Sequence, residues 1–222
     1  MMKKINIAID GPSAAGKSTI SKKVAKSLNY IHLDSGAMYR SAAYKALKVN
    51  IDLADEEKLV KMLQKTSIQL TVDGRVLLDN EDVSKEIRTE QISMSASLIS
   101  KLSGVREILV AEQRKMALDK GYIMDGRDIG TVVLKDAEVK IFLTASVEAR
   151  ARRRYLQDKE AGMDVSLEVL KEEIEKRDYQ DTHREVSPLK KAEDAIVVDS
   201  SDLSIDEVVS EILDIINKKV ME

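Results

Sequence analysis

The 222-residue chain contains no cysteine, only two prolines and no long apolar run. Without cysteine, it can form neither disulfides nor thiolate metal sites, a composition that fits a reducing compartment. A helix that spans a membrane needs about 18 to 20 apolar residues, and no such run occurs. The apolar stretch before Asp10 is about five residues long, too short for a signal peptide. We therefore expect a cytoplasmic protein without a membrane segment.

The two signs of charge nearly balance, with a formal net charge of -3. Such a chain has no overall attraction to nucleic acid or to anionic membranes, so any positive site must be local. Hydrophobic residues make up 43% of the chain, enough to build a core. Repeats and low-complexity tracts are absent from the sequence. We expect a monomer with one core, and no nucleic-acid partner.

A phosphate-binding loop is the clearest feature that is present. Residues 11–18 read GPSAAGKS and fit the pattern G-x-x-x-x-G-K-[ST] at every fixed position. An apolar run, residues 5–10, precedes the loop, and apolar residues at helical spacing follow it at Ile20, Val24 and Leu28. The loop thus lies between a predicted strand and a predicted helix, which is the setting that the motif requires.

The residue types of this loop suit a nucleoside triphosphate. Gly11 and Gly16 allow a tight curl whose amides point at phosphate oxygens, and the helix dipole adds to the attraction. Lys17 would reach the outer phosphates, and the Ser18 hydroxyl would ligate Mg²⁺. The predicted triphosphate-binding residues are Gly11, Pro12, Ser13, Ala14, Ala15, Gly16, Lys17, Ser18 and Thr19.

Strand-like and helix-like segments alternate along the chain, which predicts an α/β fold with a parallel sheet. The predicted strands cover residues 5–9, 30–33, 121–124, 139–143 and 195–198. Their nearly continuous apolar character is typical of a sheet covered on both faces. Residues 205–220 carry apolar side chains at helical spacing and predict an amphipathic helix that closes the fold.

Two segments interrupt this alternation. Residues 67–72 and 75–78 flank Asp73 and Gly74, which is a strong hairpin signal, and predict an inserted subdomain over residues 36–105. An arginine-rich run, residues 150–154, follows a core strand and leads into a polar stretch. We predict that this second excursion forms a movable lid over residues 150–168.

The phosphate loop alone does not separate GTPases, motor ATPases and small-molecule kinases. The sequence has no N-K-x-D guanine-reading motif, which argues against a GTPase. Asp125 ends an apolar run as a Walker-B carboxylate would, although a strand that ends at a turn looks the same. Arginines favour a kinase with a phosphorylated acceptor, because guanidinium groups grip phosphates, whereas a solvated basic face is the other interpretation. They are Arg40, Arg106, Arg127, Arg150, Arg152, Arg153, Arg154, Arg177 and Arg184.

Four further segments, residues 33–40, 81–89, 125–133 and 177–184, together resemble the bacterial cytidylate kinase family. The resemblance runs from residue 5 to about residue 210. It implies a single P-loop NTPase domain over residues 1–222, with a five-stranded parallel sheet flanked by helices. A monophosphate-binding insert with a small antiparallel sheet and a short lid would complete it. The implied reaction is Mg²⁺-dependent phosphoryl transfer from ATP to CMP or dCMP.

The resemblance also implies roles for individual residues. Asp128 and Arg106 would read the cytosine with help from Ser97. Arg40, Arg127 and Arg184 would hold the phosphate, while Arg177 and Asp181 would contact the sugar. The implied CMP-binding set is Ser35, Arg40, Ser97, Arg106, Arg127, Asp128, Arg177, Asp181 and Arg184. The implied catalytic residues are Lys17, Arg127, Arg150 and Arg154; Mg²⁺ would bind Ser18, with Asp34 or Asp125 acting through water.

Other functions stay open at this point. Another small P-loop kinase could act on AMP, UMP or a non-nucleotide such as shikimate, although the inserted hairpin argues against the shikimate type. A regulatory module that binds nucleotide without phosphoryl transfer is a different class, against which the arginines argue. The only histidines are His32 and His183, both expected to be bystanders. A general base is not required, because the acceptor phosphate, with a second pKa of about 6, is already ionised.

Overall fold

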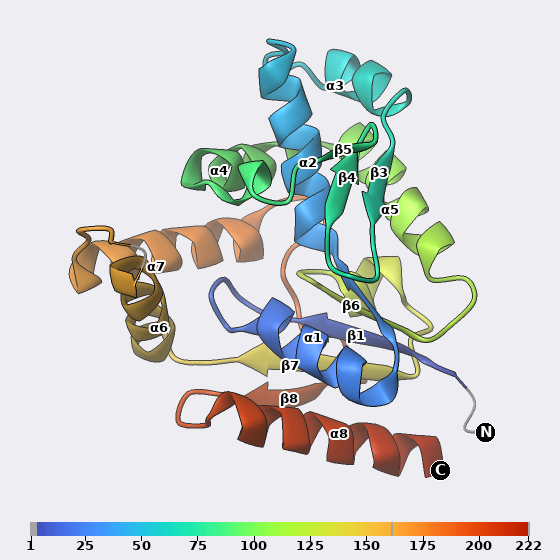
Figure 1. The fold of residues 1–222 in the computed structure, drawn as a ribbon, viewed down its shortest axis with the longest axis vertical. Coiled ribbons are helices and arrows are strands. Elements are labelled where there is room, and N and C mark those ends of the chain that lie inside the picture. The colour runs from blue at the N-terminus through green and yellow to red at the C-terminus, as the bar shows by residue number, and fades with distance from the viewer. Residues whose placement is uncertain (1–3, 161, 222) are drawn as a thin grey trace. The chain divides into compact units, whose positions relative to one another are not determined.

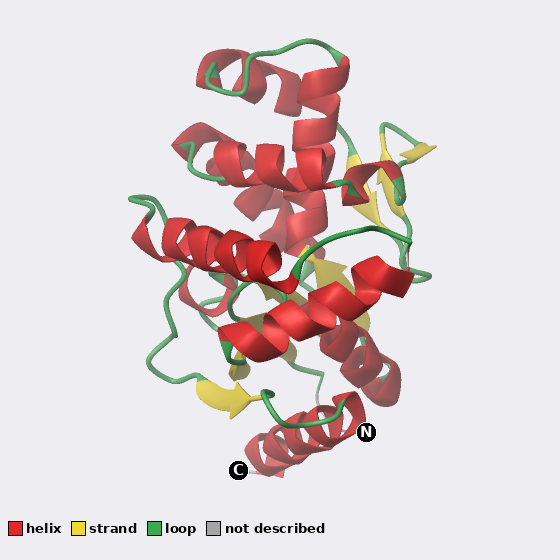
Figure 2. Cartoon of the chain, turned by 90° about the vertical axis from the view of Figure 1, so that its left-hand side faces the viewer, coloured by secondary structure: helices red, strands yellow, loops and turns green. Residues whose placement is uncertain are grey.

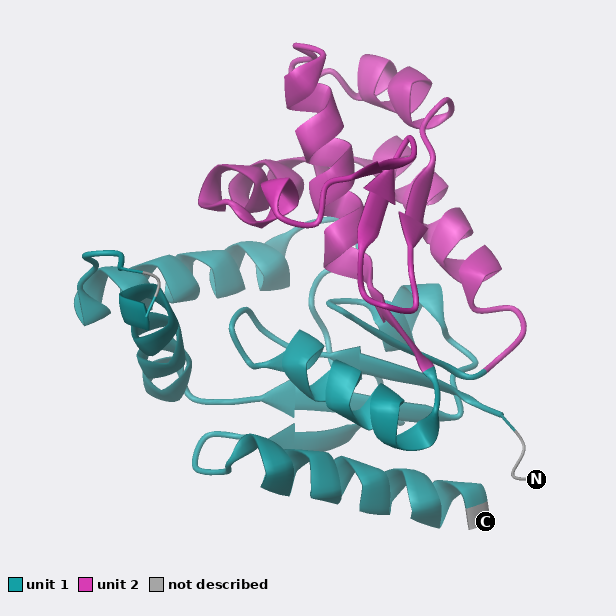
Figure 3. Ribbon diagram, in the orientation of Figure 1, with its two compact units in different colours: residues 1–30, 121–222 teal, residues 31–120 magenta. Residues whose placement is uncertain are grey.

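The computed structural model describes residues 4–160 and 162–221. It divides into two compact units, which Figure 3 colours separately. Unit 1 comprises the chain up to Tyr30 and from Gly121 onward, and unit 2 comprises Ile31–Lys120. In the residues described, none of the helices is long and apolar enough to cross a membrane.

The main sheet has five strands in the order β2–β6–β1–β7–β8 (Figure 1). Their bounds are β1 (Asn6–Asp10), β2 (Ile31–Asp34), β6 (Tyr122–Gly126), β7 (Val139–Thr144) and β8 (Ile196–Asp199). Strand β1 pairs in parallel with β6 and β7, and β7 pairs in parallel with β8. All five predicted strands and the α/β class are confirmed. All five strands end one or two residues later than predicted, because polar terminal residues such as Asp10 continue the ladder although they end the apolar run.

Helices α1 (Lys17–Leu28) and α8 (Ile205–Met221) pack along the sheet of unit 1 (Figure 1). Ile20 and Val24 of α1 and Ile212 of α8 join Ile7 and Ile141 of the strands in one buried cluster. Such a cluster is the main stabilising term of the unit. Both helices were predicted from their apolar spacing and are confirmed.

Two further helices of unit 1 follow β7. Helix α6 (Val147–Glu160) and helix α7 (Leu167–His183) pack together through a small apolar cluster of Ala151, Leu170 and Ile174. A short π-helical turn, η2 (Ile129–Val133), follows β6. Helix α6 carries Arg150 and Arg154, helix α7 carries Arg177 and Asp181, and η2 directly follows Arg127 and Asp128.

Apart from β2, unit 2 consists of helices and a small antiparallel sheet. Figure 2 draws the helices of the chain in red and its strands in yellow. The sheet has the order β3 (Ile68–Leu70), β4 (Val76–Leu78) and β5 (Glu81–Asp82). The helices are α2 (Ser35–Lys48), α3 (Glu56–Leu63), α4 (Glu90–Ile99), α5 (Ser103–Met116) and the short 3₁₀ turn η1 (Glu86–Arg88). Unit 2 has its own core, which includes Leu59 and Leu109.

The predicted hairpin is confirmed as β3 and β4, with Gly74 in its turn at φ 85°. Both strands are shorter than predicted. Thr71 already belongs to the turn, because its carbonyl accepts a hydrogen bond from the Gly74 amide at 2.9 Å.

Candidate active site

The phosphate loop connects β1 to α1, and both of its glycines are required by the backbone. Gly16 is the N-cap of α1 with φ 86°, a conformation that L-residues rarely adopt. A Cβ on Gly11 would lie 1.9 Å from the Leu143 carbonyl oxygen. Gly16 has no side chain with which to cap the first amides of α1. These amides therefore face the loop as donors for an anion.

Lys17 is buried inside the loop. Its Nζ donates to the carbonyl oxygens of Gly11 at 2.8 Å and Pro12 at 2.6 Å. Burial, together with the positive charge of Arg127, lowers the pKa of Lys17 well below its ordinary value. A phosphate beside the ammonium group would favour the charged form again. The Lys17 ammonium group therefore lies inside the phosphate loop, where burial strengthens its attraction to a bound polyphosphate.

Ser18 and Asp125 lie side by side. The Ser18 hydroxyl donates to Oδ2 of Asp125 at 2.9 Å, and Asp125 is buried near the end of β6. Two neighbouring oxygen ligands fit Mg²⁺, which prefers one or two protein oxygens and completes its shell with water and phosphate. Across residues 4–160 and 162–221, there is no cluster of three His, Asp or Glu side chains that could hold a metal ion.

Asp34, the other carboxylate predicted near Mg²⁺, belongs to unit 2 and has partners there. It caps α2 by accepting from the Ala37 amide at 2.9 Å, and it pairs with Arg40 at 2.8 Å. Burial by itself would raise the pKa of Asp34, but the charge of Arg40 and the hydrogen bonds from the Ala37 amide and Arg40 together hold it below its ordinary value.

Of the arginine-rich run, Arg150 is the residue that reaches the phosphate loop. Its Nη1 donates to the Ser13 carbonyl at 2.9 Å and to Oδ2 of Asp178 at 2.5 Å. Oδ1 of Asp178 accepts from the Ser13 amide at 3.2 Å, so one carboxylate connects the phosphate loop and Arg150. Arg154, predicted beside Arg150 as catalytic, pairs with Asp158 on its own helix and is 43% exposed.

Asp178 was missed by the sequence reasoning, which singled out only its neighbours. The available signal was its position directly after Arg177, within the segment of residues 177–184. Contact with a loop 165 positions away in the sequence cannot be read from that position.

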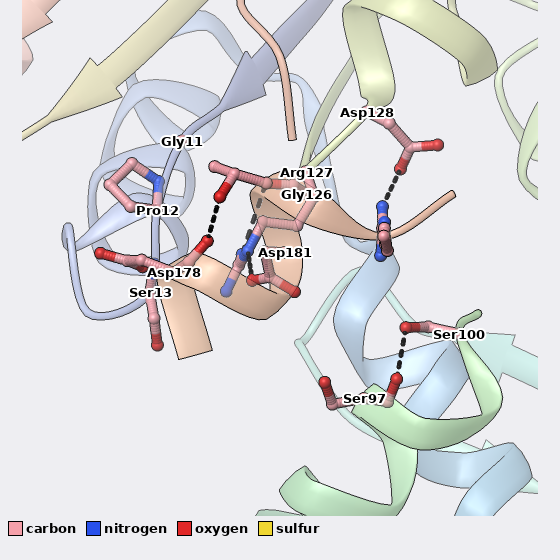
Figure 4. Close-up of polar contacts among 12 residues, drawn as sticks. Gly11, Pro12, Ser13, Ser97, Ser100, Gly126, Arg127, Asp128, Asp178 and Asp181 are labelled. Atoms are coloured by element: carbon pink, nitrogen blue, oxygen red, sulfur yellow. Dashed lines mark hydrogen bonds and ion pairs between the residues drawn. The ribbon is translucent and has the colours of Figure 1, made fainter. Parts of the chain in front are cut away.

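Four of the five acceptor-site residues that lie in unit 1 form two arginine–carboxylate pairs (Figure 4). Arg127 donates through Nε to Oδ2 of Asp181 at 2.7 Å. Burial alone would raise the pKa of Asp181, but the charge of Arg127 and its hydrogen bond hold it below the ordinary value. Nη2 of Arg184 lies 3.7 Å from Oδ1 of Asp128, and both side chains are buried. Arg177, the fifth, is half-buried on α7.

The acceptor-site residues of unit 2 lie on three helices, α2, α4 and α5. Arg106 is buried; its Nη1 donates to the Ser100 carbonyl at 3.2 Å, and its guanidinium lies 5.7 Å from the centre of the Tyr39 ring. The Ser97 carbonyl accepts from the Ser100 hydroxyl at 2.9 Å (Figure 4). Ser100 is thus a shared neighbour that the sequence reasoning did not name. Ser35 is buried at the start of α2.

Comparison with known proteins identifies the family. A family model described as cytidylate kinase matches residues 7–218. A cytidylate kinase of Caldicellulosiruptor bescii is 56% identical over 99% of this chain and 98% of its own length. That of Bacillus subtilis is 53% identical over 99% of both chains.

Solved structures agree at the level of the fold. Shikimate kinases from Bacteroides thetaiotaomicron and Acinetobacter baumannii superpose with TM-scores of 0.51 and 0.52 at 12% and 15% identity. They cover 97% and 100% of this chain, and 99% and 97% of their own length is matched. At such identity the likeness shows a P-loop kinase fold alone. The family match and the close relatives decide the rest: the chain belongs to the cytidylate kinase family, and it is an enzyme, a (d)CMP kinase.

Proposed function

We propose that this enzyme transfers the γ-phosphoryl group of ATP to CMP or dCMP in a Mg²⁺-dependent reaction, with the residues predicted above as its site. The observation that carries the residue assignment is the pair of contacts Arg127–Asp181 and Arg184–Asp128. They bring two cationic and two anionic groups to the C-terminal end of β6 and to the end of α7. A monophosphate with a polar base needs both kinds of partner.

On the donor side, the loop amides and Lys17 would bind the phosphates of ATP. Mg²⁺ would be held by Ser18, with Asp125 acting through water. When bound, it neutralises charge on the outer phosphates of the donor. Lys17 exchanges the carbonyls of Gly11 and Pro12 for phosphate oxygens, which accept more strongly because they are charged.

On the acceptor side, Asp128 would accept from the cytosine amino group. Arg106 would donate to the ring nitrogen and the carbonyl, with Ser97 assisting. Uracil carries a carbonyl in place of that amino group, so Asp128 would face an oxygen and lose its partner. A buried polar group left without its partner is the strongest means of discrimination that a site has.

The remaining acceptor contacts follow from charge. Arg40, Arg127 and Arg184 would hold the phosphate of CMP, while Arg177 and Asp181 would contact its sugar.

We propose residues 36–105 as the acceptor-binding insert and residues 150–168 as the lid. Both substrates would be served by one chain, so we propose a monomer, acting in the cytoplasm where ATP and nucleoside monophosphates are at hand.

Phosphoryl transfer itself then requires alignment and charge stabilisation. The acceptor phosphate is already ionised at neutral pH, so it needs no general base. Lys17, Arg127 and Arg150 would stabilise the charge on the group in flight. Arg154 would contribute after exchanging Asp158 for phosphate.

The experiment is a coupled ADP-release assay with Mg²⁺-ATP and each of CMP, dCMP, UMP and AMP. We expect kcat/KM for CMP and dCMP to exceed that for UMP by about 100-fold or more, as is usual when a site hydrogen-bonds the group that differs. A preference for UMP or AMP would make the base-site assignment wrong. Turnover with none of the four would point to a nucleotide-binding module.

The base assignment is tested by Asp128→Ala. The CMP-to-UMP ratio of kcat/KM should fall by about 100-fold, because the amino group loses its acceptor, while KM for ATP changes less than about threefold. Asp136→Ala, at an exposed carboxylate eight positions further along, is the control and should leave both quantities unchanged. Equal losses for ATP and CMP in Asp128→Ala would instead indicate a structural role.

A further inference from the structure

Asp10 is a buried carboxylate to which the reaction described above gives no role. It is the last residue of β1, directly before the phosphate loop, and only 4% of it is exposed. Its Oδ1 accepts from the Ile129 amide and its Oδ2 from the Gly130 amide, each at 2.8 Å. Two short bonds to an ionised carboxylate are strong ones. Asp10 therefore holds the start of η2.

The topology explains why Asp10 reaches this place. Strands β1 and β6 are parallel neighbours, and Asp10 lies opposite Gly126 in their register. The chain leaves β6 through Arg127 and Asp128 and then turns into η2. Because parallel strands end at the same edge of a sheet, the Asp10 side chain meets the amides that follow Asp128.

Asp128 occupies the N-cap position of η2, where an aspartate normally binds the amide of the second or third residue with its own carboxylate. Here the second amide, that of Gly130, is taken by Asp10 instead. The carboxylate of Asp128 makes no capping hydrogen bond to η2 and lies 3.7 Å from Nη2 of Arg184. The cap is thus supplied by a neighbouring strand.

We infer that Asp10 is a positioning residue for base recognition: by capping η2 in place of Asp128, it keeps the Asp128 carboxylate directed toward the acceptor site. This inference rests on the proposed role of Asp128 and deepens it. At Gly130 a Cβ would lie 3.1 Å from Cδ of Lys140, which is a tight contact, and 3.4 Å from Oδ2 of Asp10.

The charge of Asp10 supports the same role. The pKa of Asp10 is raised to about 6, mainly by burial and to a smaller degree by the charge of Asp128. Its two amide hydrogen bonds and the charge of Lys17 lower the pKa but do not outweigh burial. At pH 7 and above, Asp10 is therefore mainly ionised. Both of its oxygens are then acceptors, as two amide donors require.

The test begins with Asp10→Asn, which keeps the shape but offers an NH₂ group to one of the two amides. The Gly130 amide then competes for the Asp128 carboxylate. We expect the CMP-to-UMP ratio of kcat/KM to fall about 10-fold and KM for CMP to rise, with KM for ATP changed less than about threefold. A ratio equal to that of the wild type would overturn the inference.

A double-mutant cycle separates this role from a general loss of structure. If Asp10 acts through Asp128, Asp10→Asn should reduce the ratio no further once Asp128→Ala is present. Additive losses would contradict the inference. Ile212→Ala in the α8 core is the matched control, since it should lower Tm without moving the ratio.

Amide hydrogen exchange gives a readout independent of turnover. The amides of Ile129 and Gly130 should be protected in the wild type and should exchange at least about 10-fold faster in Asp10→Asn. If these two amides exchanged at the same rate in Asp10→Asn as in the wild type, Asp10 would not be the cap of η2. If the wild type failed to phosphorylate CMP, the proposed function would fail, whereas the exchange data would still decide whether Asp10 holds η2.

Discussion

At the scale of single residues, the two glycines of the phosphate loop are needed for different physical reasons. At Gly11, the obstacle is space, because a Cβ would collide with a backbone carbonyl of β7. At Gly16, the obstacle is conformation, because φ is 86° although none of the described heavy atoms lies within 4 Å of the Cβ position. The two glycines of the motif are thus required by two different constraints, steric space at Gly11 and backbone conformation at Gly16.

These constraints predict different costs. Gly16→Ala should lower the free energy of unfolding by about 1 kcal/mol through backbone strain. Gly11→Ala should lower it by about 3 kcal/mol, because a collision with backbone is added to strain. Urea unfolding measures both.

Gly74→Ala is the control for this pair. Gly74 has φ 85° and equally open space around its Cβ position, but it lies in the hairpin of unit 2. Its cost should match that of Gly16→Ala, with ATP binding unaffected. If Gly11→Ala were as stable as Gly16→Ala, the phosphate loop would be able to shift away from the Leu143 carbonyl of β7, and the larger cost expected for Gly11→Ala would be wrong.

At the scale of elements, α6 and α7 are tied to the phosphate loop by one carboxylate. Asp178 of α7 binds both Arg150 of α6 and the Ser13 amide. One helical turn further, Asp181 binds Arg127. The spacing of three residues places Asp178 and Asp181 on neighbouring positions of one surface of α7, and Arg184 follows as the C-cap of the helix. Helix α7 therefore contacts both the donor loop and the residues proposed for the acceptor.

The tie predicts a stability effect of Asp178→Asn. Among the residues that the structure describes, the variant leaves the buried Arg150 with the carbonyls of Ser13 and Ala145 as its hydrogen-bond acceptors. We expect a loss of about 2 kcal/mol in urea unfolding. Asp206→Asn is the control: its ion pair with Lys23 is also short, at 2.7 Å, but exposed, and should contribute less than about 1 kcal/mol. Equal losses in the two variants would contradict the tie.

At the scale of the whole molecule, the chain builds two cores. One joins the parallel sheet to α1 and α8, and the other holds the helices of unit 2 together. The phosphate loop lies entirely in unit 1, whereas the residues proposed for CMP are divided between the units. The two substrates should therefore stabilise different parts of the chain.

Amide hydrogen exchange, measured in the presence of a non-hydrolysable ATP analogue or of CMP, tests whether the two ligands stabilise different parts of the chain. At about 100 times Kd, each ligand should stabilise what it binds by about 2.7 kcal/mol. The analogue should protect amides of β1 and α1, whereas CMP should protect amides in both units. Lys17→Ala should remove the protection by the analogue and leave that by CMP. Protection confined to unit 1 with CMP would contradict the proposed roles of Arg40 and Arg106.

Much of this architecture is predictable from local patterns. The five strands, the helix after the phosphate loop, the hairpin at Gly74 and the closing helix all follow from the spacing of apolar residues and from turn chemistry. Each of these signals is contained in a short stretch of chain. The family, too, is evident from motifs in sequence order.

The polar contacts of the site are a different matter, because their partners come from distant parts of the chain. Arg150 and Arg154 belong to one arginine-rich run, yet only the packing of α6 on α7 turns Arg150 to the phosphate loop. Asp10 accepts hydrogen bonds from amides 119 and 120 positions further along the chain, and Asp178 accepts one from the Ser13 amide at a separation of 165 positions. By itself, then, the sequence determined the fold class, the phosphate loop and the family. Only the tertiary structure decided which charged side chains become partners, since that depends on which strand and helix ends are brought together.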